Sequence, residues 1–383
     1  MRTISKTNIP KLRTRIFWQK GLEVMYDILE LYRVGADPFD RPDAVVPQDP
    51  RHMPQTLEVG SRLHRLLLFH INYYMRGGVD SVTAVKAMSK IFDEHPEYYL
   101  PEYAINLDPE VLSQALQAVG LNYRKSQTPQ FWVENARRLV ERYDADPGNI
   151  FLGLDSWDEA VRRIRNDHRG NGFKGFQHKM VSMIIYYFMD AGFVSPFNFP
   201  IPVDIHVARV TLANEIVKVY GDQDSNVYTD TVLDAIRNFY LWCAEEAGLE
   251  PLELCNAVWL YSKAKCADNP EAEWRQEGEF DNRSTVLYKK DLLWDQTAAI
   301  NQWLRACGTC RFSTTCNWNV PAGPYYKWGE IKLNDRRLGP QGFTGNIIEP
   351  ADLASGFRYV RKANVTAAAD APPNPNQLGF DLD

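Results

Sequence analysis

Three cysteines stand close together in the segment CGTCRFSTTC, which spans residues 307–316. Thiolates at this spacing converge on a soft metal, because several sulfur ligands can share its charge. Tetrahedral zinc and an iron–sulfur cluster are the usual occupants, and both take four ligands. The sequence offers three further cysteines from which the fourth ligand would come: Cys243, Cys255 and Cys266.

The composition of the 383-residue chain is that of an ordinary globular protein, with 45% hydrophobic and 24% charged residues. No apolar run approaches membrane-spanning length, and residues 1–20 lack the apolar core of a signal peptide. We therefore expect a cytoplasmic protein with no membrane partner. Thiols stay reduced in that compartment, which favours metal ligands and buried thiols over disulfides.

Basic residues gather in two places although the net charge is −6. Residues 1–20 contain six Lys and Arg and no acidic residue, and a second basic run extends from Arg162 to Lys179. Each run is either a solvated face of the protein or a surface that contacts phosphate groups.

Apolar residues recur at helical spacing along most of the chain, so the sequence predicts an all-α fold. Residues 108–120 open with Asp-Pro-Glu and close with Gly, as a helix with both ends marked does. Residues 179–192 are so apolar that we expect a buried central helix there. Further helices are expected within residues 56–75, 80–95, 128–148, 155–167 and 203–217.

Three segments occur in an order that resembles a known family: GFKGFQHKMVSMIIYYF, then PVDIHVARV, then the C-x2-C-x5-C group. The family is the helix-hairpin-helix DNA glycosylase superfamily, in its iron–sulfur branch that includes endonuclease III. Gly175–Lys179 takes the place of the family hairpin, and Val203–Val210 is similar to its V-D-T-H-V-x-R-V motif. Upstream, VGLNYRKSQ resembles the family's G-L-Y-N-x-K-A segment, and AVWLYSKAKC resembles the segment that ends at the first cluster ligand.

The resemblance implies a six-helix barrel domain followed by a helical cluster domain. The corresponding boundaries are residues 1–61 for a basic helical extension packing with the cluster domain, 62–203 for the barrel, 204–345 for the cluster domain and 346–383 for a disordered tail. The cluster domain carries an insertion, residues 267–306, between the first and second ligands. The implied ligands of a [4Fe–4S] cluster are Cys266, Cys307, Cys310 and Cys316, and zinc stays open as the alternative occupant.

The resemblance also assigns residues to catalysis and DNA binding. Lys179 falls at the position of the lyase nucleophile, and Asp204 matches the catalytic carboxylate. Taken alone, Lys179 is a solvated or phosphate-binding charge, and Asp204 is a helix N-cap. The implied DNA contacts comprise a wedge after the second barrel helix, the hairpin and a basic residue: Met75, Arg76, Gly77, Gly78, Gly175, Gln177, His178 and Arg209.

Three functions fit these features, and all involve flipping a base out of double-stranded DNA. The favoured one resembles a phage branch of the superfamily, the α-glutamyl/putrescinyl thymine pyrophosphorylases. These enzymes transfer an amino acid or amine, such as glycine, onto phosphate-activated 5-hydroxymethyldeoxyuridine during thymidine hypermodification of a phage genome. The first alternative is a DNA N-glycosylase and AP lyase of endonuclease III type. The second is a protein that binds modified bases without chemistry.

The end of the chain, QLGFDL at Gln377–Leu382, follows a segment rich in Ala, Pro and Asn. It resembles the peptide by which DNA enzymes bind a sliding clamp, since a flexible tether would present Leu378, Phe380 and Leu382 to an apolar groove. A chance pattern is the alternative. We otherwise expect a monomer.

Overall fold

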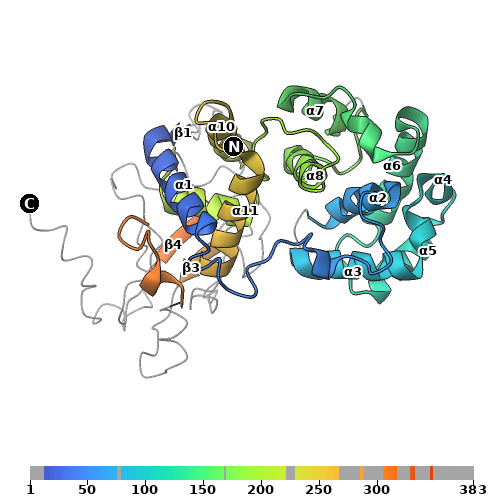
Figure 1. Cartoon of the computed structure of the whole chain (residues 1–383), viewed down its shortest axis with the longest axis horizontal. Coiled ribbons are helices and arrows are strands. Elements are labelled where there is room, and N and C mark those ends of the chain that lie inside the picture. The colour runs from blue at the N-terminus through green and yellow to red at the C-terminus, as the bar shows by residue number, and fades with distance from the viewer. Residues whose placement is uncertain are drawn as a thin grey trace, which may run out of the picture. The chain divides into compact units, whose positions relative to one another are not determined.

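The structure is a computed structural model that describes residues 13–75, 79–167, 170–220, 229–266, 285–288, 305–316, 328–332 and 346–347. The chain divides into two compact units. Unit 1 comprises Met1–Ala44, Val203–Phe239 and Ala257–Asp383, and unit 2 comprises Val45–Pro202 and Tyr240–Asn256. The described residues are mostly helical, so the expected all-α class is confirmed (Figure 1).

Unit 2 is built from helices and 3-10 turns. In chain order these are η1(Pro50–His52), α2(Arg62–Ile71), η2(Asn72–Tyr74), α3(Ser81–Glu94), η3(Pro96–Tyr99), α4(Pro101–Ala104), α5(Pro109–Ala118), α6(Gln127–Tyr143), η4(Pro147–Phe151), α7(Trp157–Ile164) and α8(His178–Asp190). Side-chain caps fix where several of the helices begin. Ser61 accepts a hydrogen bond from the His64 amide, Asp80 from the Thr83 amide and Asp108 from the Glu110 amide.

Helix α8 forms the centre of unit 2, as its sequence predicts. Nearly all of its side chains from Met180 to Met189 are buried, because an apolar helix gains most when every face is removed from water. It packs against α2 and α7, and Figure 1 shows α8 running beside α2. This packing places the first turn of α8, which carries His178 and Lys179, at one end of the unit's core.

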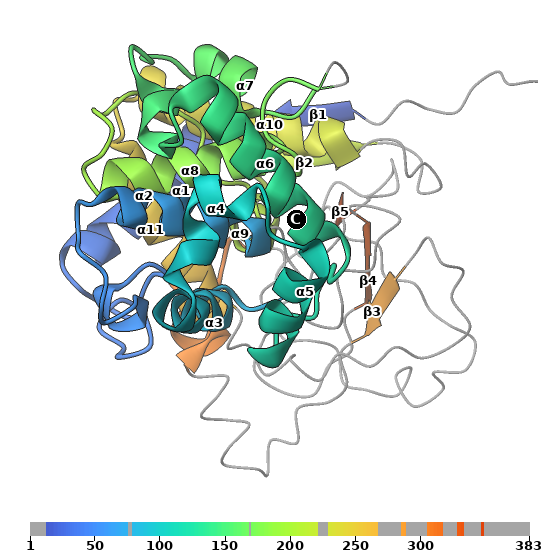
Figure 2. The same cartoon turned by 90° about the vertical axis from the view of Figure 1, so that its right-hand side faces the viewer.

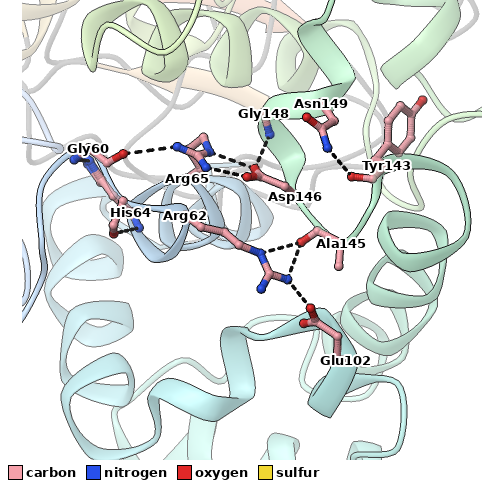
Figure 3. A network of polar contacts seen from close by, with 11 residues as sticks. Gly60, Arg62, His64, Arg65, Glu102, Tyr143, Ala145, Asp146, Gly148 and Asn149 are labelled. Carbon is pink, nitrogen blue, oxygen red and sulfur yellow. Dashed lines mark hydrogen bonds and ion pairs between the residues drawn. The ribbon is translucent and has the colours of Figure 1, made fainter.

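A polar network ties the start of α2 to the segment between α6 and η4 (Figure 3). Arg65 forms an ion pair with Asp146 through two bonds, one of them from Nε to Oδ1 at 2.9 Å. Arg62 donates to the carbonyl of Ala145 and to Glu102. Burial alone would raise the pKa of Asp146, but hydrogen bonds from Arg65 and Gly148 hold it below its usual value. The network therefore fixes α2, and with it η2, relative to α6.

Unit 1 contains helices and short strands, and two of its helices extend into unit 2. The elements are β1(Arg13–Ile16), α1(Trp18–Arg33), α9(Ile205–Ala213), β2(Val217–Tyr220), α10(Thr229–Glu245), α11(Pro251–Tyr261), the π-helical turn η6(Ser262–Cys266), β3(Thr285–Tyr288), η8(Cys307–Thr309), β4(Trp328–Lys332) and β5(Asn346–Ile347). Gly21 of α1 lies so close to Phe239 that a Cβ atom there would be 2.4 Å from the ring. Glycine is thus required where α1 meets α10.

The strands are the main difference from the expected all-helical chain. β1 pairs antiparallel with β2, so that Arg13 lies opposite Tyr220, and β3, β4 and β5 form a second antiparallel sheet (Figure 2). Each strand has at most five residues. Such short strands contain too few residues for a periodic hydrophobic pattern. The pairing of β1 with β2 depends on the fold of unit 1, because the two strands are distant in sequence.

Several sequence predictions fall outside the described residues. These are Arg76, Gly77 and Gly78 of the wedge, most of the insertion 267–306, and the clamp-binding peptide Gln377–Leu382. Of the expected tail, only β5 is described. Across the described residues, no helix combines the length and apolar character needed to cross a bilayer.

Candidate functional site

The hairpin turn of unit 2 comprises residues 172–177, between α7 and α8. Phe173 and Phe176 are buried and pack on Phe69, with ring centroids 5.1 and 5.2 Å apart. Gly172 has a φ of +66°, and a Cβ atom there would lie 2.1 Å from the Arg165 carbonyl, so only glycine fits. The aromatic side chains anchor the turn in the core and leave its polar residues outside.

Gln177, which the sequence analysis expects on DNA, ends the hairpin turn with an ordinary backbone conformation. Its φ is −108° and its ψ is −179°, an extended conformation that any residue adopts. Gly175, in contrast, has a φ of 84° and uses the freedom of glycine. The backbone at Gln177 is therefore unstrained, and its amide side chain is exposed.

Lys179 lies in the first turn of α8 and reaches back to the end of η2. Its amine donates a hydrogen bond to the backbone carbonyl of Met75. The Met75 side chain itself is buried, with 3% exposed. The structure thus brings Lys179 to the residue that directly precedes Arg76, while the wedge role of Met75 and Arg76 stays a prediction.

Asp204 is the N-cap of α9, and its carboxylate has three hydrogen-bond donors. Oδ1 accepts from the amides of His206 at 2.8 Å and Val207 at 3.0 Å. Oδ2 accepts from Nε1 of Trp259 at 3.1 Å. The Lys263 amine lies 4.7 Å from the centre of the Trp259 ring. The carboxylate is therefore a capping group, held in one orientation by an aromatic side chain from α11.

The two candidate catalytic residues belong to different units, Lys179 to unit 2 and Asp204 to unit 1. Their joint action stays a prediction. Arg209, expected on DNA, is buried in unit 1 with 6% exposed. The positive charge of Arg209 lowers the pKa of the Cys266 thiol, but burial raises that pKa by more. The structure thus places Arg209 among the cysteine-bearing segments.

The four predicted ligand cysteines gather in unit 1. Cys266 ends η6, Cys307 begins η8, and the Cys310 amide donates to the Cys307 carbonyl at 3.2 Å. Burial, together with the charges of Cys310 and Cys307, raises the pKa of Cys266 to about 12. Burial and the nearby Cys310, Cys266 and Cys316 likewise raise the pKa of the Tyr261 phenol. All four thiols therefore lie within electrostatic range of the Tyr261–Cys266 segment.

Two observations test whether this group of thiols suits a metal cluster. All six cysteines of the chain are free thiols, so none of the four is consumed by a disulfide. Among the described residues, however, no three His, Cys, Asp or Glu side chains converge closely enough to hold a metal ion. The donor set therefore fits a soft metal in the chemistry of its four thiols, while the described side chains do not converge on one metal position. Cys243 and Cys255 are buried, and burial raises the pKa of Cys243 to about 12.

A polar clasp, formed by Asp37 and Arg41 with Lys265 and Thr309, holds together the segments on either side of the insertion. Arg41 donates to the carbonyls of Ala264 and Arg305, the latter at 2.6 Å. The Lys265 amine is bonded to the Asp37 carboxylate and, at 2.6 Å, to the Thr309 hydroxyl. The clasp thus holds Lys265, the residue before Cys266, against Thr309 of η8. Asp37 and Arg41 of the N-terminal segment support this contact.

Breaking the clasp is expected to destabilise unit 1. The Lys265 side chain is only 2% exposed, so Asp37→Asn leaves a buried ammonium without its anion and should lower the free energy of unfolding by about 2–4 kcal/mol. Guanidinium unfolding followed by circular dichroism measures the loss. Lys90→Met is the control, because Lys90 is 63% exposed and 3.9 Å from Glu94; it should change stability by less than about 0.5 kcal/mol.

The ionisation of Asp37 should also make the stability of unit 1 depend on pH. Burial alone would raise the pKa of Asp37, but Lys265 and Arg41 hold it below the ordinary 3.8. A lowered folded pKa means that the wild type gains stability above pH 3.8 and loses it as the pH falls below this value. Asp37→Asn should lack this loss. An Asp37→Asn protein as stable as the wild type at neutral pH would show that the clasp contributes nothing.

Sequence analysis did not identify Asp37, Arg41, Trp259 or Asn135 as supporting residues. Each acts through contacts to residues distant in sequence, and no spacing in the sequence predicts such contacts. Trp259 had the strongest local signal, because it lies in AVWLYSKAKC, the segment already singled out for Cys266. Asn135 had a weaker one, as a polar residue on the buried face of α6.

Comparisons with known proteins give a likeness in structure only. No protein-family model matches the sequence, and no curated protein matches it. One similar solved structure is a trapped endonuclease III–DNA covalent intermediate in an estranged-adenine complex. It has a TM-score of 0.43 and 13% identity over 79% of this chain and 96% of that chain.

A second similar solved structure is a non-covalent endonuclease III–DNA complex. It has a TM-score of 0.42 and 14% identity over 77% of this chain and 94% of that chain. Both TM-scores lie below 0.5, so these similarities assign neither a family nor an activity to this chain.

Proposed function

We propose that this chain is a DNA base-modifying enzyme of the helix-hairpin-helix glycosylase type. It transfers an amine, such as glycine, onto a phosphate-activated 5-hydroxymethyldeoxyuridine in double-stranded DNA. The observation that carries the proposal is the position of Lys179. This residue lies in the first turn of a buried helix that directly follows the hairpin turn, and its amine donates to the Met75 carbonyl.

The hairpin turn supports DNA binding through its exposed polar side. Gln177 is exposed, and no side chain caps the start of α8 there. The positive end of a helix of this length attracts phosphate. Arg165 and Lys174 lie on the same loop and add positive charge. Such contacts position a protein on the DNA backbone without reading its sequence.

The environment of Lys179 favours a role as a fixed positive charge. A carbonyl acceptor stabilises an ammonium group, and an ammonium binds phosphate as a point charge. In the proposed reaction, the amine nitrogen forms a bond to the exocyclic C5 methylene carbon. The bond from that carbon to the phosphate oxygen breaks, and the phosphate leaves with the electron pair. Lys179 would stabilise the negative charge of this leaving group.

The Asp204 carboxylate would orient the incoming amine. Its three donors fix the position of both oxygens, so it needs no rearrangement to receive a hydrogen bond from an ammonium group. The amine must lose one proton to attack and a second when the carbon–nitrogen bond has formed. A carboxylate beside it lowers the cost of both transfers.

A [4Fe–4S] cluster held by Cys266, Cys307, Cys310 and Cys316 would cross-link the segments on either side of the insertion. The donor set supports it, since four free thiols lie in one neighbourhood of unit 1. The clasp would keep the same segments together from the protein side. We assign the cluster a structural role, with zinc as the alternative occupant.

A DNA glycosylase and AP lyase is the second candidate, favoured by the partial burial of Lys179. A lysine amine that becomes neutral can attack C1′ of the sugar and form a covalent adduct with DNA. A protein that binds a modified base without chemistry would use the same turn and leave the DNA intact. These three functions differ in their products.

Product analysis separates the candidates. Duplex DNA carrying uracil, 5-hydroxymethyluracil or phosphorylated 5-hydroxymethyluracil is incubated with the full chain, with and without glycine, and analysed by mass spectrometry. The transferase should replace the phosphate by glycine on intact DNA, a net loss of mass equal to phosphoric acid minus glycine, only with the phosphorylated base and only with the amine. Lys179→Gln should reduce this product at least about hundredfold, whereas Lys90→Gln should not.

The opposite outcomes assign the function differently. Free base, strand breaks or a covalent adduct trapped by borohydride would replace the transferase by the glycosylase and lyase. Tight binding of the modified duplex with no product in any reaction would indicate a protein that binds the modified base without chemistry.

A further inference from the structure

Asn135 lies in the middle of α6 with none of its surface exposed, and its side chain contacts the backbone of the hairpin turn. Its Oδ1 accepts a hydrogen bond from the Lys174 amide at 2.6 Å, and its Nδ2 donates to the Lys174 carbonyl at 3.0 Å. One side chain thus satisfies both backbone polar groups of Lys174. Those two groups would otherwise be short of partners where the turn meets the core.

The other contact of Asn135 leads to η2. Its Nδ2 donates a second hydrogen bond to the Tyr73 hydroxyl at 2.9 Å. Tyr73 is 2% exposed, stacks on Trp132 at 5.7 Å and meets Phe176 of the hairpin turn at 5.9 Å. Asn135 therefore sits between the hairpin turn and the segment that ends at Met75, and it is bonded to both.

The chemistry of the site selects asparagine. The amide of asparagine carries an acceptor and two donors in one plane, and all three are used here. Aspartate would lose both donors and bury a negative charge against the Lys174 carbonyl and the Tyr73 hydroxyl. Serine has one donor and a shorter reach. Arg138, one helical turn away on α6, adds a hydrogen bond to the Gly172 carbonyl from a buried guanidinium.

We propose that Asn135 is a positioning residue that fixes the hairpin turn and η2 to each other as one preformed DNA-docking frame. The docking role rests on the proposed function, whereas the rigidity of the frame does not. A frame that is already ordered pays less conformational entropy when it binds. Loss of the Asn135 contacts should therefore weaken DNA binding more than the loss of a half-buried asparagine contact elsewhere in unit 2, that of Asn149.

Hydrogen exchange tests the frame in the full-length protein, whatever its ligand. Tyr73→Phe removes one hydroxyl and keeps the ring, so the chain should still fold. Amide exchange in residues 172–177 and 72–75 should become about tenfold faster, as expected for one lost hydrogen bond. Asn135→Ser should speed it further. Asn149→Ala is the matched control, because Asn149 donates one 2.9 Å bond to the Tyr143 carbonyl of the same unit; it should leave both segments unchanged.

DNA affinity tests the docking role on a fluorescent duplex that carries phosphorylated 5-hydroxymethyluracil, at one fixed salt concentration. The dissociation constant should rise about threefold for Tyr73→Phe and about tenfold or more for Asn135→Ser. It should change less than about twofold for Asn149→Ala.

The exchange and affinity measurements can contradict the frame and its docking role independently. Unchanged exchange in Tyr73→Phe and Asn135→Ser overturns the frame, even if the wild type binds DNA. Faster exchange with wild-type affinity shows that the frame exists and overturns its docking role. A wild type that does not bind the duplex overturns the proposed function, and the exchange result then decides the frame alone.

Discussion

Replacing Cys266 by serine is expected to remove the metal centre from the purified protein. The wild type should be brown and contain about four irons per chain, with broad absorption in the visible blue. A serine hydroxyl is a poor ligand for a soft metal, and Cys266 is the only cysteine that the η6 segment supplies. Iron content and visible absorption should therefore fall close to background, as measured by colorimetric iron and sulfide analysis and by spectrophotometry.

Cys255→Ser is the matched control for this change. Cys255 is buried in α11 with 5% exposed and lies in unit 2, whereas Cys266 lies in unit 1. This variant should keep its colour and iron. A colourless wild type with one zinc per chain would exclude the iron–sulfur cluster. Loss of iron from Cys255→Ser, with iron retained in Cys266→Ser, would show that the fourth ligand has been assigned wrongly.

The helices could be predicted from the sequence because their information is local. In α5, Asp108 caps the start, Pro109 occupies the first turn and Gly120 follows the end, and the structure has a helix from Pro109 to Ala118. In α8, a continuous apolar run predicted a buried helix, and its side chains are buried. Each of these signals lies within a dozen or so residues of the element that it specifies.

The strands and the clasp could not be predicted, because they join distant parts of the chain. Arg13–Ile16 pairs with Val217–Tyr220, although more than half the length of the chain separates the two strands. The bond between Asp37 and Lys265 spans a similar interval, and Lys265 looks in the sequence like a surface lysine. A single charge carries no information on its partner. Such contacts follow from the fold of unit 1 as a whole.

The candidate site combines local features that the sequence predicts with long-range contacts that it does not. The sequence singled out Asp204, and the structure makes it the helix N-cap that any aspartate at such a position would be. What the sequence lacked was Trp259, which holds the second oxygen of the same carboxylate. For Asn135, helical periodicity places the residue on the inner face of α6, but only the structure shows its bonds to Lys174 and Tyr73.

Asp204→Asn is expected to abolish turnover while leaving the fold and DNA binding intact. Asparagine caps a helix about as well as aspartate but loses the bond from Nε1 of Trp259, so stability should fall by no more than about 2 kcal/mol. The amide has no negative charge with which to hold an ammonium or to stabilise a positive transition state. Turnover should therefore fall at least about hundredfold, with the dissociation constant for DNA within about twofold of the wild type. Single-turnover kinetics and fluorescence anisotropy measure the two quantities.

Asp108→Asn is the matched control, because Asp108 caps α5 in the same way, through a 2.9 Å bond to the Glu110 amide. It should keep full turnover, which separates the charge of Asp204 from its capping role. Trp259→Phe removes only the donor to Oδ2, and we expect a lower kcat with little change in KM. If Asp204→Asn retained more than about a tenth of wild-type turnover, Asp204 would be a capping residue alone. The carboxylate of the reaction would then have to be sought elsewhere, because the loss would be smaller than a catalytic charge contributes.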